Sequence, residues 1–107
     1  MEGYVQKISL SQAREIAEEN ALWKLQPYMT NFTTSVLREH FEEAECCWFF
    51  FRNKEIVGPP EQALRWAWAY AVSKKGEVSI IADYSDQPEK LQEYLKKMSD
   101  YFKEKGL

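Results

Sequence analysis

The chain lacks a long apolar run, and it lacks an excess of positive charge. Its two longest apolar stretches, 46–51 and 66–72, are far shorter than the roughly 20 residues that a membrane-spanning helix requires. Its formal net charge is −3 at pH 7, whereas the phosphates of nucleic acids attract basic surfaces. We therefore expect no membrane and no nucleic acid among its partners, while a basic protein is compatible with this charge balance.

Cysteine and histidine are scarce: Cys46 and Cys47 are adjacent, and His40 is the one histidine. A disulfide between neighbouring cysteines would be strained, so we expect free thiols and a reducing, cytoplasmic compartment. Residues 1–12 contain no basic segment followed by an apolar one, so no secretory signal is expected. Zinc sites usually take four ligands at recognisable spacings, which this set does not offer. We expect no metal and no cofactor.

Catalytic patterns are missing as well, because we find neither a glycine-rich phosphate loop nor a placeable set of Ser, His and Asp. A reactive thiol at Cys46 or Cys47 would need an electropositive, partly exposed setting, and glutamates and aromatic residues stand there instead. Core packing is the favoured interpretation of both cysteines. We predict a non-enzymatic protein, and the alternative is a small enzyme or small-molecule site that uses Glu39, His40 or Asp83.

Aromatic residues, by contrast, are abundant at 15% of the chain, and many of them fall in two strand-like runs. Side chains alternate between the two faces of a strand. In the second run one face carries only alanines, and the other carries the bulk. We call this bulky set, Trp66, Trp68, Tyr70 and Val72, the aromatic face. Such a face needs a partner inside or outside the chain.

Two helices are predicted, one toward each end of the chain. Ser9 and Gln12 form a capping box ahead of a helical pattern that ends near residue 25, before Pro27. Asp86 and Glu89 read as a second capping box, followed by apolar residues at helical spacing up to residue 102. Between the helices we expect an antiparallel meander of three or four strands. The segments are a strand or ragged hairpin arm near 34–41, a strand over 46–52, one helical turn at 61–64, a strand over 66–73, a hairpin turn with positive φ at Gly76, and a return strand over 78–82.

These elements predict a single α+β domain over residues 1–107, in two layers, with an antiparallel sheet packed against an N-terminal and a C-terminal helix. The simplest packing places both helices over the alanines of the second aromatic run. The aromatic face would then be exposed, as an unusually large patch. Plain core, a protein interface and a base-stacking platform are the three interpretations left open.

A second feature is an acidic cluster that consists of Glu39, Glu42, Glu43 and Glu45. Charge runs usually decorate a solvated loop or edge strand. They can also form a docking surface, because complementary charge speeds encounter with a basic partner.

Several positions resemble the immunity protein 35 family, whose pattern runs from a helix rich in small residues through an aromatic strand to a strand, a glycine turn and a third strand. The similar residues, within about 8–82, are Ala13, Ala17 and Ala21, then Cys47-Trp48-Phe49-Phe50, then Ala69-Tyr70-Ala71-Val72 with Gly76-Glu77-Val78. The resemblance implies a cytoplasmic bacterial protein that binds and neutralises a secreted toxin, with no catalytic residues.

The main hypothesis is therefore a non-enzymatic binding protein, most simply an immunity protein that occludes a toxin, often a basic nuclease. Trp66, Trp68 and Tyr70 are the predicted contact residues, and the acidic cluster is the predicted rim. The alternative is a structural homodimer in which the aromatic face of one copy packs against that of another.

Overall fold

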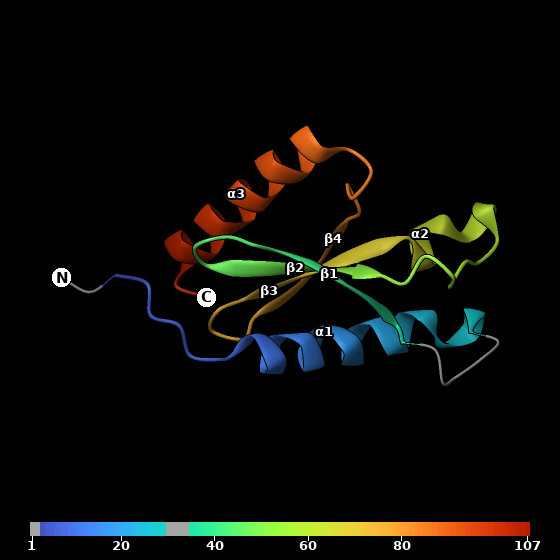
Figure 1. Cartoon of the computed structure of the whole chain (residues 1–107), viewed down its shortest axis with the longest axis horizontal. Helices are drawn as coiled ribbons and strands as arrows, with labels where there is room; N and C mark the ends of the chain where they lie inside the picture. Colours follow the sequence, from blue (N-terminus) through green and yellow to red (C-terminus); the bar gives the residue numbers. More distant parts are fainter. Residues whose placement is uncertain (1–2, 30–34) are drawn as a thin grey trace.

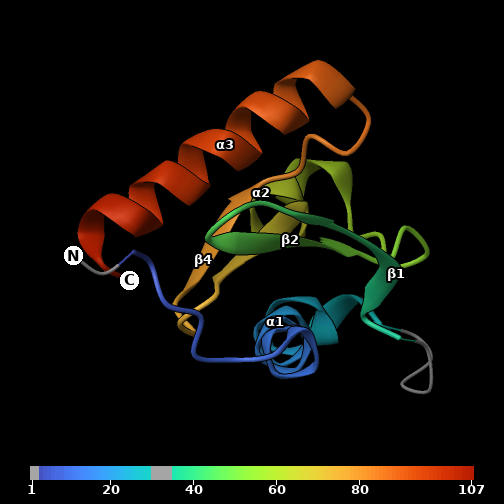
Figure 2. The same ribbon diagram turned by 60° about the vertical axis from the view of Figure 1, so that its left-hand side comes forward.

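The structure, a computed structural model, describes residues 3–29 and 35–107. A four-stranded antiparallel sheet with the order β1-β2-β3-β4 lies at its centre. Its strands are β1 (Leu37–Glu43), β2 (Cys47–Arg52), β3 (Trp68–Ser73) and β4 (Val78–Ala82). The helices are α1 (Leu10–Leu25), α2 (Ala63–Trp66) and α3 (Pro88–Lys105), with 3₁₀ turns η1 (Gln26–Tyr28) after α1 and η2 (Pro60–Gln62) before α2. Helix α1 covers one face of the sheet, and α3 covers the other (Figure 1, Figure 2).

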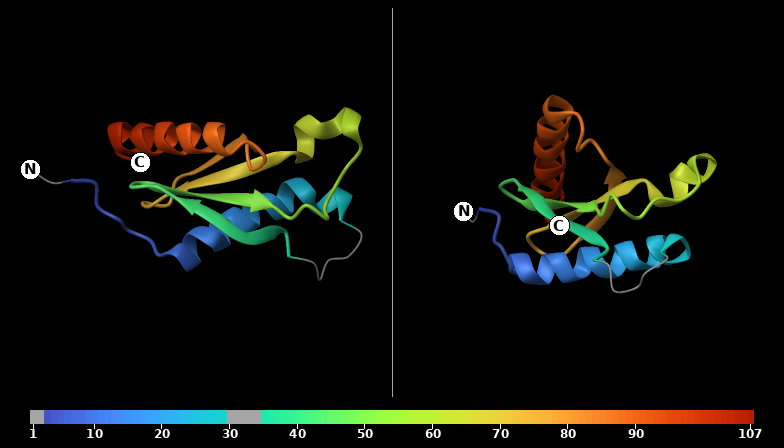
Figure 3. Two further views of the ribbon diagram at one scale, coloured as in Figure 1. Left: turned by 45° about the horizontal axis from the view of Figure 1, so that its top comes forward. Right: turned by 45° about the vertical axis from the view of Figure 1, so that its right-hand side comes forward.

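The predicted α+β class is confirmed, as are the antiparallel sheet and the helices toward both ends of the chain. The predicted packing of both helices on one face, in two layers, is wrong. The reason lies in β2, where every residue from 47 to 51 is buried. A strand that is apolar on both faces needs a layer on each side, so the sheet is sandwiched between the two long helices (Figure 3).

On the α1 face, small helix residues meet large sheet residues. Ala13, Ala17 and Ala21 are fully buried, and their spacing of four keeps them on one stripe of the helix. Because this stripe has no bulky side chains, the helix approaches the sheet closely. The space between them is filled from the sheet by Trp48, Phe50, Tyr70 and Val72.

On the α3 face, the sizes are reversed. Ala69 and Ala71 of β3 are fully buried beneath this helix, and they leave room for large side chains above them. The helix supplies those side chains at the apolar positions that its sequence pattern predicted. The buried members of this layer are Cys46, Cys47, Phe49, Phe51, Ala69, Ala71, Ile81, Leu91, Leu95 and Phe102.

Some local signals are confirmed. The Gln12 backbone N–H donates to the Ser9 hydroxyl over 3.2 Å, and the Ser9 N–H donates to Gln12 Oε1 over 2.8 Å, which completes the predicted capping box. Gly76 has a φ of 103° in the β3–β4 turn, as that turn requires. Both signals are short-range, so the neighbouring sequence is enough to specify them.

Several local features differ from the prediction. Strand β3 begins at Trp68, because Trp66 ends the short helix α2, which continues the predicted turn at 61–64. Strand β1 extends to Glu43, further than the predicted arm near 34–41, of which residue 34 lies outside the described residues. Asp86 does not cap α3: Gln87 occupies the N-cap without a side-chain bond, Pro88 starts the helix, and Asp86 forms an ion pair with Lys54.

Candidate interaction surface

Two of the three predicted contact aromatics lie inside the molecule. Tyr70 has no exposed surface beneath α1, and Trp66 is 8% exposed. The Arg52 guanidinium lies 4.8 Å from the centre of the Trp66 ring, and the indole N–H donates to the Pro59 carbonyl over 3.0 Å. The expectation of an exposed aromatic face is wrong because α1 covers it, so these two residues are core residues.

Trp68 is the predicted aromatic residue that keeps part of its surface. It begins β3, and its side chain is half-buried. Its indole N–H donates to the Leu64 carbonyl over 2.7 Å, which ties the ring to the short helix α2. Trp68 therefore belongs to the end of the molecule at which α2 lies.

The acidic cluster is largely engaged within the chain. Glu43 accepts a hydrogen bond of 2.6 Å from the Lys74 ammonium, and Glu45 accepts one of 2.9 Å from Lys103. Glu42 is bonded to the His40 ring and accepts a hydrogen bond from Gln92 of α3. Glu39 is exposed on β1. These contacts stabilise the β1–β2 hairpin against α3 and the β3–β4 turn.

The cluster and the aromatics are not brought together as the prediction of a rim requires. Glu42, Glu43 and Glu45 lie at or near the β1–β2 turn, whereas Trp66 and Trp68 lie at the junction of α2 and β3. Figure 1 shows that turn and α2 at opposite ends of the long axis. The register agrees, because Glu43 is opposite Trp48 at the start of β2, and Trp68 is opposite Ala82 at the end of β4.

The candidate catalytic groups do not converge. Cys46 and Cys47 are free and buried, and burial raises the pKa of the Cys47 thiol to about 12, which keeps it protonated at neutral pH. His40 is exposed and stacks on Phe51. Asp83 pairs with Arg38 over 3.6 Å. Among residues 3–29 and 35–107, no three metal-ligating side chains come together.

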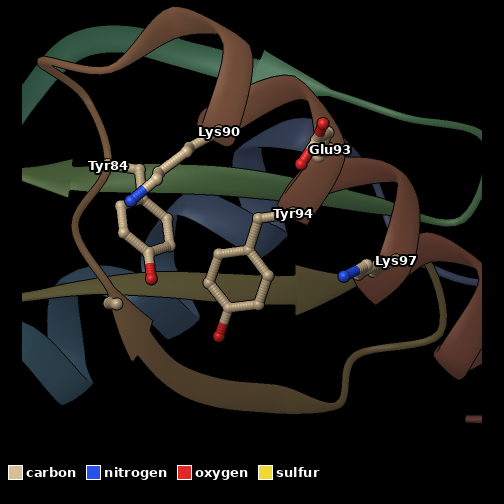
Figure 4. Close-up of a pocket in the computed structure, with 6 residues that line it drawn as sticks. Tyr84, Lys90, Glu93, Tyr94 and Lys97 are labelled. Carbon is tan, nitrogen blue, oxygen red and sulfur yellow. The ribbon is translucent and has the colours of Figure 1, made fainter.

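A shallow depression of about 360 Å³ lies between the end of β4 and α3 (Figure 4). Its lining residues are Ala82, Tyr84, Lys90, Glu93, Tyr94 and Lys97. The Tyr84 and Tyr94 rings meet edge to face at 5.5 Å, and the Lys90 ammonium lies 5.8 Å from the centre of the Tyr84 ring. Burial raises the pKa of the Tyr94 hydroxyl, which keeps it neutral. The depression presents two lysines, one glutamate and two phenols beside the sheet edge.

Three well-exposed apolar side chains belong to segments at the α2 end of the molecule, Trp23 on α1 and Val57 and Leu64 between β2 and β3. In the part of the chain that the structure describes, Leu64 is 83% exposed, Trp23 is 78% exposed and Val57 is 58% exposed. Together with the half-buried Trp68 they form what we call the apolar end. Figure 3 shows α2 and the last turns of α1 at this same end. Sequence reasoning missed Trp23 and Leu64, although Trp23 stands off the Ala13–Ala17–Ala21 stripe, which was the available signal.

The apolar end rests on a packed base. A side chain at Gly58 would have no room, because an ideal Cβ there would be 2.5 Å from Trp66 and 2.7 Å from Tyr28. The Tyr28 hydroxyl donates to Gln62 Oε1 over 2.9 Å and joins η1 to η2. Exposed apolar groups on an ordered base lose little conformational freedom when they are covered by a partner.

The fold and this surface define an α+β domain whose described residues include an exposed apolar end. Within the described ranges, no helix combines the length and the apolar character needed to cross a membrane. Comparisons with protein-family models, with curated proteins and with solved structures found no match.

Proposed function

We propose that this chain is a non-enzymatic protein-binding domain of the bacterial immunity type, which neutralises a toxin by occluding it. The observation that carries the proposal is the exposure of Trp23, Leu64 and Val57, which stand on segments at the same end of the molecule. Tryptophan is enriched among the few residues that supply most of the binding energy at protein interfaces, so Trp23 is the main candidate anchor. The toxin as partner class comes from the resemblance of the small-residue helix and the aromatic strand to immunity protein 35.

The surroundings of the apolar end support a protein partner over a small molecule. Its side chains stand out from the surface, whereas ligand sites are concave and carry a few convergent polar groups. The buried free thiols fit a reducing compartment, so we propose the cytoplasm as the site of action. With Glu42, Glu43 and Glu45 engaged in intrachain bonds, charge plays a secondary role in this proposal.

The proposal is tested by co-expression with each toxin-like product that is encoded beside its gene. Rescue of growth and a stoichiometric complex are expected for one of them. Leu64→Ala and Trp23→Ala should each weaken that complex about 30-fold, which corresponds to roughly 2 kcal/mol for a central contact. Tyr101→Ala, which truncates an exposed aromatic side chain on α3, is the matched control and should bind normally.

One result would contradict the immunity function, and another would contradict only the choice of contact surface. If no neighbouring product is toxic, or none is neutralised by this chain, the immunity function is wrong. If a toxin is neutralised equally well by Leu64→Ala and Trp23→Ala, the function stands and the apolar end is not the contact surface.

A further inference from the structure

The two edge strands of the sheet, β1 and β4, differ in how well they are protected against pairing with another chain. Strand β1 is protected: it carries five charged or titratable residues, its register shifts between Leu37 and Phe41, and Arg14 of α1 donates to the carbonyls of Arg38 and Glu39. Charges and bulges of this kind keep an edge strand from pairing with another chain. Strand β4, Val78-Ser79-Ile80-Ile81-Ala82, has no charge and no register shift against β3.

The register of the β3–β4 hairpin shows which backbone groups β4 turns outward. The Ser73 N–H donates to the Glu77 carbonyl over 2.7 Å, so these two residues form a hydrogen-bonded pair. Bonded and non-bonded pairs alternate along an antiparallel ladder. Val78, Ile80 and Ala82 are therefore in non-bonded pairs with β3, and they direct their N–H and C=O groups away from the sheet.

We propose that β4 pairs antiparallel with β4 of a second copy of this chain, about a two-fold axis at Ile80. The two four-stranded sheets then become one sheet of eight strands. In this register Ile80 is opposite its own copy, and Val78 is opposite Ala82 of the second copy. All three outward-directed residues then form bonded pairs with β4 of the second copy. The same strand supplies both sides of the interface, as an isologous interface requires.

The side chains agree with this register. Ile80 is 37% exposed on the α1 face, and the axis places it against another Ile80, so that each covers the other. Ser79 of one copy is opposite the buried Ile81 of the other, on the α3 face. If the two-fold axis lay at Ile81 instead, it would fall on a residue whose backbone groups point to β3. Val78 would then have no bonded partner in β4 of the second copy.

The symmetry of the strand favours a second copy over another occupant, because every outward-directed residue of β4 finds its bonded partner in β4 of that copy. Glu77 follows the alternation of Ser79 and Ile81, so its side chain lies on the α3 face, and the axis places it opposite Asp83 of the other copy. Asp83 is turned toward Arg38. The like charges of Glu77 and Asp83 oppose the pairing, and the ion pair of Asp83 with Arg38 offsets part of that repulsion.

The exposed edge of β4 is distinct from the apolar end, so this inference does not rest on the proposed function. A strand edge is a small interface of the weak class, below about 1,200 Å². The dimer should therefore form as the concentration rises from about 10 µM to about 1 mM, a range of roughly 3 kcal/mol in free energy.

Sedimentation velocity over that range tests the pairing. The wild type should move from monomer to dimer, and Ile80→Lys should stay monomeric because two ammonium groups would meet at the axis. Tyr101→Lys is the control and should dimerise like the wild type. A wild type that stays monomeric throughout, or an Ile80→Lys variant that dimerises normally, would overturn the proposal.

Two further measurements keep the test sharp if Ile80→Lys fails to fold. Under mild oxidation Ile80→Cys should cross-link across the axis, since bonded pairs have Cα atoms about 5.5 Å apart, whereas Ser79→Cys should not, because its copy is beyond the roughly 7 Å limit. Glu77→Lys should strengthen the dimer, because its ammonium group would face the Asp83 carboxylate of the second copy. Equal cross-linking at both positions, or a dimer weakened by Glu77→Lys, would rule out this register.

Discussion

At Gly58 the backbone runs closer to two aromatic rings than any side chain would allow. Gly58→Ala would place a Cβ 2.5 Å from Trp66 and 2.7 Å from Tyr28, so the rings or the backbone must move. We expect it to destabilise the fold by about 1–3 kcal/mol, as overpacked sites do, measured by urea unfolding. Gly3→Ala is the control, because nothing lies within 4 Å of its Cβ. Equal stability of both variants would mean that the rings do not close over Gly58.

Two buried ionisable groups, the Cys47 thiol and the Tyr70 hydroxyl, make the stability of the fold sensitive to high pH. Burial raises the pKa of the Cys47 thiol from 9.0 to about 12, and that of the Tyr70 hydroxyl from 10.0 to about 12. Above pH 9 the unfolded chain releases protons that the folded chain still holds. The contribution of these two groups to stability should therefore be constant below pH 9 and should fall as the pH rises from 9 to 12.

Tyr70→Phe tests this account by urea unfolding between pH 7 and pH 11. The Tyr70 hydroxyl is buried and has no hydrogen-bond partner among the described residues, so its removal should leave stability at pH 7 unchanged or raised. The alkaline loss should become shallower, because one of the two proton releases is gone. Parallel pH curves for the variant and the wild type would show that Tyr70 does not contribute.

Among the elements, α1 depends on its first turn. Its buried stripe is largely alanine, so it gains less from apolar burial than α3 does, and the capping box at Ser9 and Gln12 supplies part of what is missing. Ser9→Ala should destabilise the protein by about 1 kcal/mol, measured by thermal or urea unfolding. Ser11→Ala, an exposed helical position two residues on, should change stability by less than about 0.5 kcal/mol. Similar losses for both would remove the cap as the cause.

Elements that depend on neighbouring residues could be predicted from the sequence, and those that depend on distant ones could not. The Ser9 box and the Gly76 turn involve residues within four positions of one another. The start of β3 was misplaced because Trp66 is held by Arg52 and Pro59, which the alternating pattern of the run does not reveal. The exposure of Leu64 was equally invisible, since it follows from where α2 is placed by η1 and η2.

At the scale of the whole molecule, size complementarity decides which helix covers which face. The sequence contains two alanine sets, one in α1 and one in β3, and it predicts only that each needs a large neighbour. The structure matches the alanines of α1 to the aromatic face of the sheet, and the alanines of β3 to the large residues of α3. Which helix covers which face depends on the path of the loop that connects the helix to the sheet. Local sequence patterns do not encode that path.

The three-layer arrangement predicts that neighbouring residues of β2 are equally costly to truncate. Phe49 is buried under α3, and Phe50 is buried under α1, each without exposed surface. Phe49→Ala and Phe50→Ala should each destabilise the protein by about 3–5 kcal/mol, because each leaves a cavity in a closed layer. With both helices on one face, only one of the two would be so costly. Urea unfolding of the pair, with the exposed Ile80→Ala as control, distinguishes the two packings, and a loss confined to one phenylalanine would contradict the three-layer fold.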